Sequence, residues 1–272
     1  MNSTILSLSL FLFQQVYTTA DFVQAPGANL KARFDAAVQQ GRRGADDTFW
    51  VAYQFPVRAG VRIDARFGGL NITRSSDGIE WVPEGGASQR VGLFFMTRKS
   101  DGGIEKVRML DLNSNYRFHD RKVYWAGEGG TNDSLDLLMS LLQDPKRPTS
   151  TITTAIGIHD TAGAIEKLIA LARGNYPAEV KRSAISQLGQ EAGRRAADEL
   201  GRMAADASFD AELQRQVVSA IGRRSDDEAV PMLIKVAGEH PALSVRKQAI
   251  TLLGQKKDNR AIDFLERQLL KR

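Results

Sequence analysis

A ten-residue pattern that occurs three times constrains the fold of this chain more than any other feature. It reads VKRSAISQLG over residues 180–189, LQRQVVSAIG over 213–222 and VRKQAITLLG over 245–254. The closing glycines are 33 and 32 residues apart, and a step of 32 back from Gly189 reaches Gly157, which closes the related run TITTAIG. A period of this length indicates stacked supersecondary units that share one core.

The first part of each copy has the pattern of an amphipathic helix. In the clearest copy Val180, Ile185 and Leu188 lie nine, four and one residues before the glycine. At about 100° per residue these positions fall on one broad helix face. The glycine suits a left-handed helix end, where a Cβ is unfavourable. In three copies the turn that follows contains an aspartate placed to cap a second helix: Asp160, Asp226 and Asp258.

The second helix of each copy has a register of its own. Alanine recurs seven residues after the glycine, at Ala164, Ala196, Ala229 and Ala261, and leucine recurs eleven residues after it, at Leu168, Leu200, Leu233 and Leu265. Residues 134–144, SLDLLMSLLQD, fit a second helix that has no first helix before it. We therefore predict that residues 131–272 form an α-helical solenoid of about four hairpins preceded by one helix, which covers the end of the stack.

This pattern resembles the HEAT repeat, in particular the short HEAT-like repeats first described in phycobiliprotein lyases. The resemblance rests on the apolar helix that ends in Leu/Ile-Gly, the Asp-containing turn and the Ala-x-x-x-Leu of the second helix, and it covers residues 134–272. It implies a stacked helical scaffold, since members of this class mostly bind proteins and a few have enzymatic or nucleic-acid roles. Residues 1–130 resemble no family.

Residues 26–130 predict a short helix followed by strands. Asn29 is placed to cap a helix over 30–40, and later runs have strand composition: 49–55, 57–67, 79–82, 91–98, 104–112, 116–118 and 122–125. The loop at 99–103 predicts a hairpin between the runs on either side of it. We expect an antiparallel β domain, joined to the solenoid by residues 127–132, and thus an α+β fold.

Three arginines lie on one face of the predicted strand over 57–67, namely Arg58, Arg62 and Arg66. They could bind an acidic ligand together. The alternative that we favour is a solvated outer face, where Asp64 and carboxylates of neighbouring strands are their partners.

The first 25 residues indicate a signal peptide. Residues 5–13, ILSLSLFLF, have the length of its apolar segment and are too short to span a bilayer, and small residues that suit cleavage end at Ala20 and Ala25. No Lys or Arg precedes the run, so a buried element of the fold is the alternative. We expect a periplasmic or secreted protein with no transmembrane segment after cleavage; without cleavage it would be cytoplasmic.

HEAT-like arrays usually present their second helices to a partner, so charged residues of these helices are the candidate protein-binding residues. They are Lys167, Arg194, Arg195, Glu199, Arg202, Glu228, Lys235, Asp263 and Arg267. Their mixed signs suit a protein surface better than a phosphate backbone. The first helices carry a repeated cation at Arg182, Arg215 and Lys247, which we expect to pair with the turn aspartates between repeats.

No catalytic, metal or cofactor motif is present in the sequence. It has three histidines and no cysteine, and it contains no HExxH, Walker A or GxSxG motif. The net charge of +5 is spread evenly over both halves, which makes a nucleic-acid partner unlikely. We expect a non-catalytic protein-binding scaffold or adaptor without a cofactor. The alternatives are an intracellular nucleic-acid-binding HEAT-like protein and a lyase-like chaperone for a prosthetic group.

Overall fold

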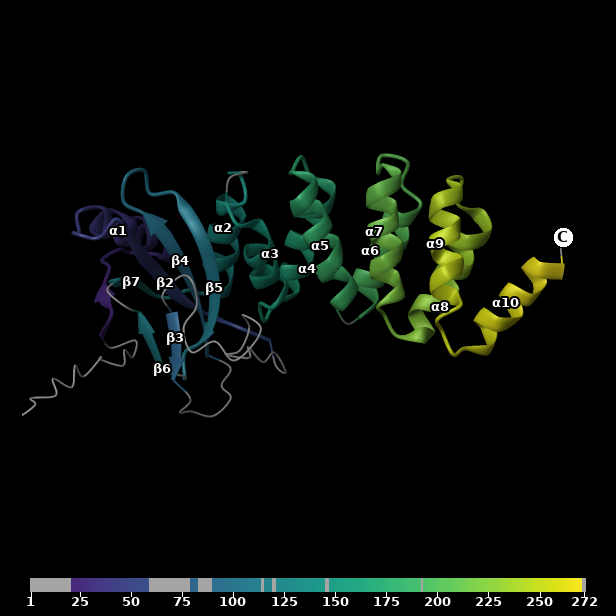
Figure 1. The fold of residues 1–272 in the computed structure, drawn as a ribbon, viewed down its shortest axis with the longest axis horizontal. Helices are drawn as coiled ribbons and strands as arrows, with labels where there is room; N and C mark the ends of the chain where they lie inside the picture. Colours follow the sequence, from purple (N-terminus) through teal and green to yellow (C-terminus); the bar gives the residue numbers. More distant parts are fainter. Residues whose placement is uncertain are drawn as a thin grey trace, which may run out of the picture.

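The computed structural model describes residues 21–58, 79–82, 90–113, 115–118, 121–144, 147–191 and 193–270. In these residues a sheet domain is followed by a row of helices that extends away from it (Figure 1). This is the α+β architecture that the sequence predicts. The runs at residues 1–20 and 59–67, including Arg62 and Arg66, lie outside the described residues.

The sheet has five strands in the order β1 (Val23–Gln24), β7 (Val123–Glu128), β2 (Thr48–Pro56), β4 (Arg90–Arg98) and β5 (Ile104–Asp111). β2, β4 and β5 are antiparallel, and β4 and β5 form the predicted hairpin. β7 runs parallel to both β1 and β2, so the prediction of an antiparallel domain is wrong for these strands. The physical reason is a crossover connection. After β5 the chain passes through β6 (Asn115–Phe118), which belongs to a second sheet, and then re-enters the main sheet as β7, beside β2.

Each face of this sheet is covered by a different element. On one face lies α1 (Leu30–Arg42), which begins as predicted, because Asn29 Oδ1 accepts a hydrogen bond of 2.8 Å from the backbone N–H of Ala32. Phe34 of this helix packs edge to face on Phe95. The other face carries an aromatic cluster that includes Trp50 of β2 and Phe118 of β6. β6 pairs with β3 (Ile79–Val82) in a separate two-stranded sheet.

β1 shows that the fold begins before residue 26. Phe22 is buried against Phe94, Phe118 and Trp125, and the backbone N–H of Ala25 donates to the carbonyl of Trp125 at 2.9 Å. Residues 22–25 are therefore part of the sheet domain. The predicted linker is short, since β7 ends at Glu128 and α2 begins at Thr131.

The helical array consists of one helix and four hairpins, as predicted. α2 (Thr131–Leu141) comes first, and the hairpins are α3 (Thr149–Gly157) with α4 (Ala162–Arg173), α5 (Ala178–Gln190) with α6 (Arg194–Ala204), α7 (Ala211–Gly222) with α8 (Asp226–Glu239), and α9 (Leu243–Leu253) with α10 (Asn259–Leu270). One buried core runs from Phe34 and Val51 in the sheet domain through Leu138 of α2 to Ala261 of the last hairpin. α2 thus joins the sheet to the stack.

The repeated glycines serve close packing between neighbouring repeats. The prediction of a left-handed helix end is wrong, since Gly254 has a φ of −63° and the other three are not among the described glycines with positive φ. A Cβ at Gly157, Gly189 or Gly222 would instead approach the next first helix to within 3.0 Å. The contact is with backbone only at Gly189, where the Cα of Ala220 leaves no room for a side chain, whereas Gly157 and Gly222 face the side chains of Gln187 and Leu252.

Only one of the three turn aspartates caps the second helix. Asp258 Oδ1 accepts from the backbone N–H of Arg260 at 2.8 Å, as predicted. The cap of α4 is Thr161 in place of Asp160, and α8 begins after Ser225, which puts Asp226 in the first turn. Asp226 there pairs with Lys256 at 2.9 Å, so its charge stabilises contact between repeats.

Candidate functional site

The candidate protein-binding residues lie on the second helices or at their ends, but many are already paired within the molecule. Lys167 Nζ of α4 contacts Asp136 of α2 at 2.9 Å, and Arg195 of α6 forms a bidentate pair with Glu166 of α4 at 2.9 and 3.0 Å. Each pair joins one second helix to the preceding one. These ion pairs hold the row of second helices in register, although exposed pairs contribute only about 0–1 kcal/mol each.

Glu199 is the centre of a denser network. Its carboxylate is buried and accepts hydrogen bonds from Arg173, at the end of α4, and from Arg202 of α6. Burial raises the pKa of Glu199, but the hydrogen bonds and charges of the two arginines outweigh it and lower the pKa below its usual value. Arg173 also binds Asp206 at 2.7 Å. Glu199 therefore stabilises the array from within, where a partner protein does not reach it.

The remaining candidate residues differ in whether their side chains are engaged in ion pairs or hydrogen bonds within the protein. Glu228 pairs with Arg224 at 2.9 Å, and Arg267 donates to the backbone carbonyl of Asp263 at 3.0 Å. Within the described parts of the chain, no ion pair or side-chain hydrogen bond engages the side chains of Arg194, Lys235 and Asp263, which leaves them available to a partner. Binding by these residues remains a prediction.

A groove of about 720 Å³ lies between α6 and α8. Its apolar lining includes Ala197, Ala204, Met232 and Val236, while charges of both signs surround it: Asp198, Arg202, Lys235 and Glu239. Two of the predicted residues, Arg202 and Lys235, are thus brought together at one depression. Small residues create the space, because Gly201 of α6 and Ala205, which directly follows this helix, also line it.

His240, which also lines this groove, follows α8 directly. Its Nδ1 accepts a hydrogen bond of 3.1 Å from the backbone N–H of Ala242, so in the neutral ring the proton is on Nε2. His240 is buried, and its Nε2 has no hydrogen-bond partner in the described structure. A buried donor of this kind favours a ligand or water oxygen nearby.

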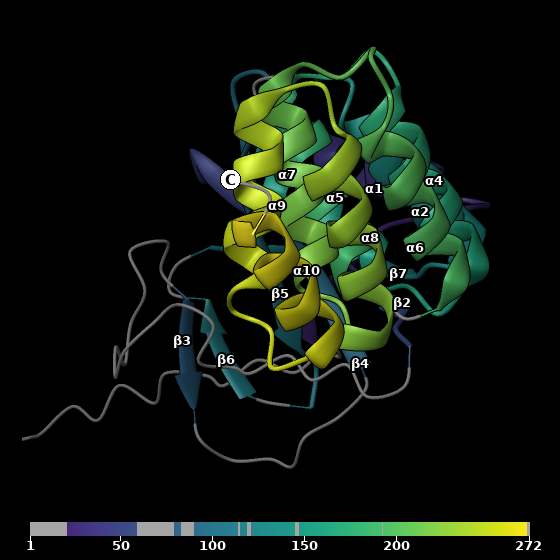
Figure 2. The same ribbon diagram turned by 90° about the vertical axis from the view of Figure 1, so that its right-hand side faces the viewer.

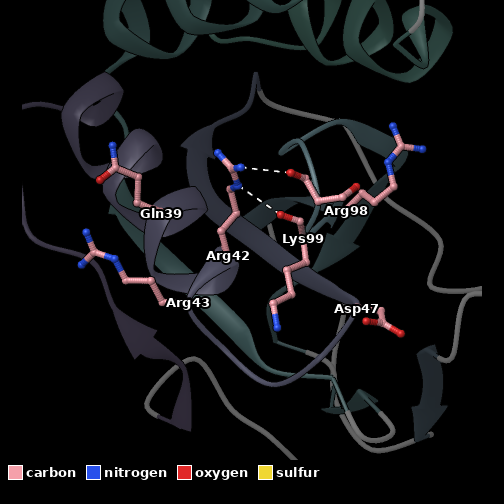
Figure 3. A pocket seen from close by; sticks show the side chains of 7 residues that line it. Gln39, Arg42, Arg43, Asp47, Arg98 and Lys99 are labelled. Carbon is pink, nitrogen blue, oxygen red and sulfur yellow. Dashed lines mark hydrogen bonds between the residues drawn. The ribbon is translucent and has the colours of Figure 1, made fainter.

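A second hollow of about 830 Å³ lies between α1 and the loop after β4, lined by Gln39, Arg42, Arg43, Asp47, Arg98, Lys99 and Ser100 (Figure 3). Arg42 is held there by the backbone carbonyls of Lys99 and Ser100, at 3.1 and 3.0 Å. Arg98 pairs with Asp101 and points away from Arg43 in Figure 3. The cations therefore do not converge on one anion-binding point.

Sequence reasoning missed a column of polar residues two positions after each repeated glycine, namely His159, Glu191, Arg224 and Lys256. The Arg224 guanidinium donates to the carbonyl of Glu191 at 2.6 Å, and Lys256 Nζ donates to the carbonyl of Arg224 at 3.3 Å. This fixed spacing from the glycine was the available signal. The expected ladder of first-helix cations is wrong, since Arg215 pairs with Glu212 of its own helix. Among the described residues, no ion pair joins Arg182, Arg215 or Lys247 to a turn aspartate.

Glu191 connects the column to the sheet domain. Its carboxylate pairs with Arg58, just after β2, and the backbone N–H of Arg58 donates to the carbonyl of Ile158 at 3.0 Å. Burial raises the pKa of Glu191, and the charges of Arg58 and Arg224 partly offset this. Arg58 is thus not on the solvated outer face that we favoured, because it ties the sheet domain to the first two hairpins.

A buried hydrogen-bond chain lies at the same junction. His159 Nδ1 is 2.6 Å from the carbonyl of Ala155, which can only accept, so Nδ1 carries the proton. His159 Nε2 then accepts from Ser134 Oγ at 2.8 Å, and Ser134 Oγ accepts from Tyr53 at 3.0 Å. Burial lowers the pKa of His159 to about 4 and raises that of Tyr53. With all three side chains buried, the chain has a structural role.

Comparison with known families finds a match in the second half of the array. The family model of HEAT repeats matches residues 197–272, which include the groove between α6 and α8, and the N-terminal half has no family match. No curated protein matches the chain. HEAT repeats generally mediate protein–protein interactions and are generally non-catalytic scaffolds. In the described residues, no group of three or more His, Cys, Asp or Glu is placed to hold a metal, and no helix is long and apolar enough to cross a membrane.

Proposed function

We propose that this HEAT-repeat protein is a non-catalytic scaffold or adaptor, which acts after export and binds a partner protein through the second-helix side of its array. The observation that carries the proposal is the groove between α6 and α8. It offers an apolar floor with charges of both signs around it, which is the composition of a protein-binding surface with a desolvated centre and a polar rim.

The ion pairs between second helices support this function. Lys167 with Asp136 and Arg195 with Glu166 fix the relative positions of α2, α4 and α6 before any partner binds. A rigid surface loses less conformational entropy on binding, which favours affinity. Lys235 has no ion pair or side-chain hydrogen bond within the described structure. Among the charged residues at the groove, it is therefore the one that we most expect to contact the partner.

The same pairs argue against a nucleic-acid partner. A phosphate backbone requires unneutralised Lys and Arg along its path. Here Lys167, Arg195 and Arg202 each face a carboxylate of the array. The surface therefore presents alternating signs, which favours a protein with complementary charges.

Export is supported by the apolar run at residues 5–13 and the small residues after it. Of the two cleavage positions, Ala20 is the one compatible with the fold, because cleavage after Ala25 would remove Phe22 and β1 from the sheet. N-terminal sequencing of the protein purified from its native cells tests this. A mature chain that begins at Asp21 is expected, and an intact Met1 would contradict export.

The binding site is tested by affinity capture with the full chain and two groove variants. Lys235→Glu reverses an exposed charge at the groove, and Ala205→Trp fills it from an exposed position. We expect each to reduce retention of the wild-type partner by about 10-fold or more, as for a change at the centre of an interface. Lys122→Glu, an equal charge reversal on the sheet domain, is the control. Equal retention by all four proteins would refute binding at the groove.

A further inference from the structure

The last hairpin exposes apolar positions that the preceding hairpin buries. Ile250 of α9 is 39% exposed, whereas Val218, at the same position of α7, is fully buried. Ile262 of α10 is 47% exposed, and its equivalent Val230 in α8 is fully buried. Val218 and Val230 belong to helices on which α9 packs, so α9 and α10 expose a face that the preceding hairpin has covered.

The closing glycine shows the same difference. A Cβ at Gly222 would lie 3.0 Å from Leu252 of the next first helix. At Gly254 the nearest atom would be the carbonyl oxygen of Thr251, in its own helix, at 3.5 Å. In Figure 2, which looks at this end of the array, α10 and α9 face the viewer with no other described helix in front of them.

The uncovered face carries two stripes with opposite charges. Both have an apolar residue, a charged residue four positions later and another apolar residue three positions after that. The stripe of α9 is Leu243, Lys247 and Ile250. The stripe of α10 is Ile262, Glu266 and Leu269. Lys247 and Glu266 are exposed, and neither has an ion pair or side-chain hydrogen bond to another described residue.

The charges of the two stripes are complementary, since one stripe carries a lysine and the other a glutamate, whereas two copies of the same stripe would bring like charges together. If α9 of one molecule lies against α10 of another, the apolar residues meet and Lys247 faces Glu266. A two-fold axis makes this contact twice, which is the property of an isologous interface. Open stacking of copies head to tail is blocked, because α2 and the sheet domain cover the other end of the array (Figure 1).

We propose that the free face of α9 and α10 binds a second copy of this chain, as a closed two-fold dimer with Lys247 of each molecule paired to Glu266 of its partner. The inference does not depend on the groove between α6 and α8, which lies on another pair of helices. The dimer presents two sheet domains at its far ends and two grooves, so it would bind two partner molecules.

The test is a charge exchange measured by light scattering on the full chain, from about 1 to about 100 μM, the range where interfaces of modest affinity dissociate. The wild type is expected to reach the mass of two chains. Lys247→Glu and Glu266→Lys each place like charges across the axis, and we expect each to raise the dimer Kd by about 10-fold or more. The double variant restores opposite charges and is expected to dimerise like the wild type.

Lys122→Glu is the matched control, since it reverses an exposed lysine on the sheet domain, and its Kd is expected to equal that of the wild type. Circular dichroism of each variant establishes that it is folded. A wild type that remains a single chain at the highest concentration overturns the proposal. So does a dimer that both single variants leave intact, or a double variant that is no better than the single ones.

Discussion

Alanine in place of Gly189 and of Gly254 should change stability in opposite directions, although the two residues occupy the same position of their repeats. At Gly189 the new Cβ would lie 2.9 Å from the Cα and from the carbonyl oxygen of Ala220. Both atoms are backbone of α7, so a helix has to move to make room. At Gly254 the nearest atom is 3.5 Å away, which is ordinary van der Waals contact.

The magnitude follows from two opposing terms. Alanine restricts the unfolded chain more than glycine does, which stabilises the folded protein by about 0.4–1 kcal/mol wherever the backbone allows it. Gly254 has a φ of −63° and gains this term alone. At Gly189 overpacking costs about 1–3 kcal/mol, so Gly189→Ala is expected to lower the free energy of unfolding by about 0.5–2 kcal/mol.

The assay is urea and thermal unfolding of both variants followed by circular dichroism. The Lys247→Glu background keeps Gly254 away from a second copy of the chain. The two free energies of unfolding should differ by about 1–3 kcal/mol, or roughly 3–10 °C in Tm for a chain of this size. Equal stability of the two variants would refute close packing as the reason for the repeated glycine, and a less stable Gly254→Ala would point to the helix end instead.

Two further predictions concern the buried chain between the sheet domain and the array. Ser134→Ala leaves the Tyr53 hydroxyl and His159 Nε2 without partners and should lower the free energy of unfolding by about 2–5 kcal/mol. Tyr53→Phe should lower it by only about 0.5–1.5 kcal/mol, because Ser134 keeps its bond to His159. Equal losses in urea unfolding would contradict the hydrogen-bond chain. Because the pKa of His159 falls from 6.5 to about 4 on folding, stability is full above about pH 6.5 and should fall by about 2 kcal/mol between about pH 6.5 and 5. His159→Gln should lack this decrease in denaturation curves at the two pH values; an unchanged slope would rule out His159 as its source.

The helical array could be predicted from the sequence because its signals are local and repeated. The spacing of apolar residues from each glycine placed one helix and four hairpins correctly, and Asn29 and Asp258 were correctly identified as caps. A helix face is set by its own periodicity, so a single sequence suffices to recognise it. The β4–β5 hairpin was predictable for the same reason, since its turn and both its strands are contiguous.

Pairing between distant segments could not be predicted in this way. No local signal distinguishes a strand such as β7, which lies parallel beside β2, from one that continues an antiparallel meander. Arg58 looked like one of three equivalent arginines, but it meets Glu191, which is far away in the sequence. Charged residues of the second helices were predicted as candidates for binding a partner protein, and only the structure shows that Lys167 and Arg195 are paired between repeats.

The sequence by itself determined that this chain contains a stack of helical hairpins with a HEAT-like pattern, because periodicity acts within a few helical turns. The tertiary structure decided what the repeated glycine is for and which faces remain uncovered. Gly189 and Gly254 occupy the same position of their repeats, but one lies against Ala220 and the other against no neighbouring helix of the described chain. That difference arises from the distance between helices that are not adjacent in the sequence, so the pattern alone does not contain it.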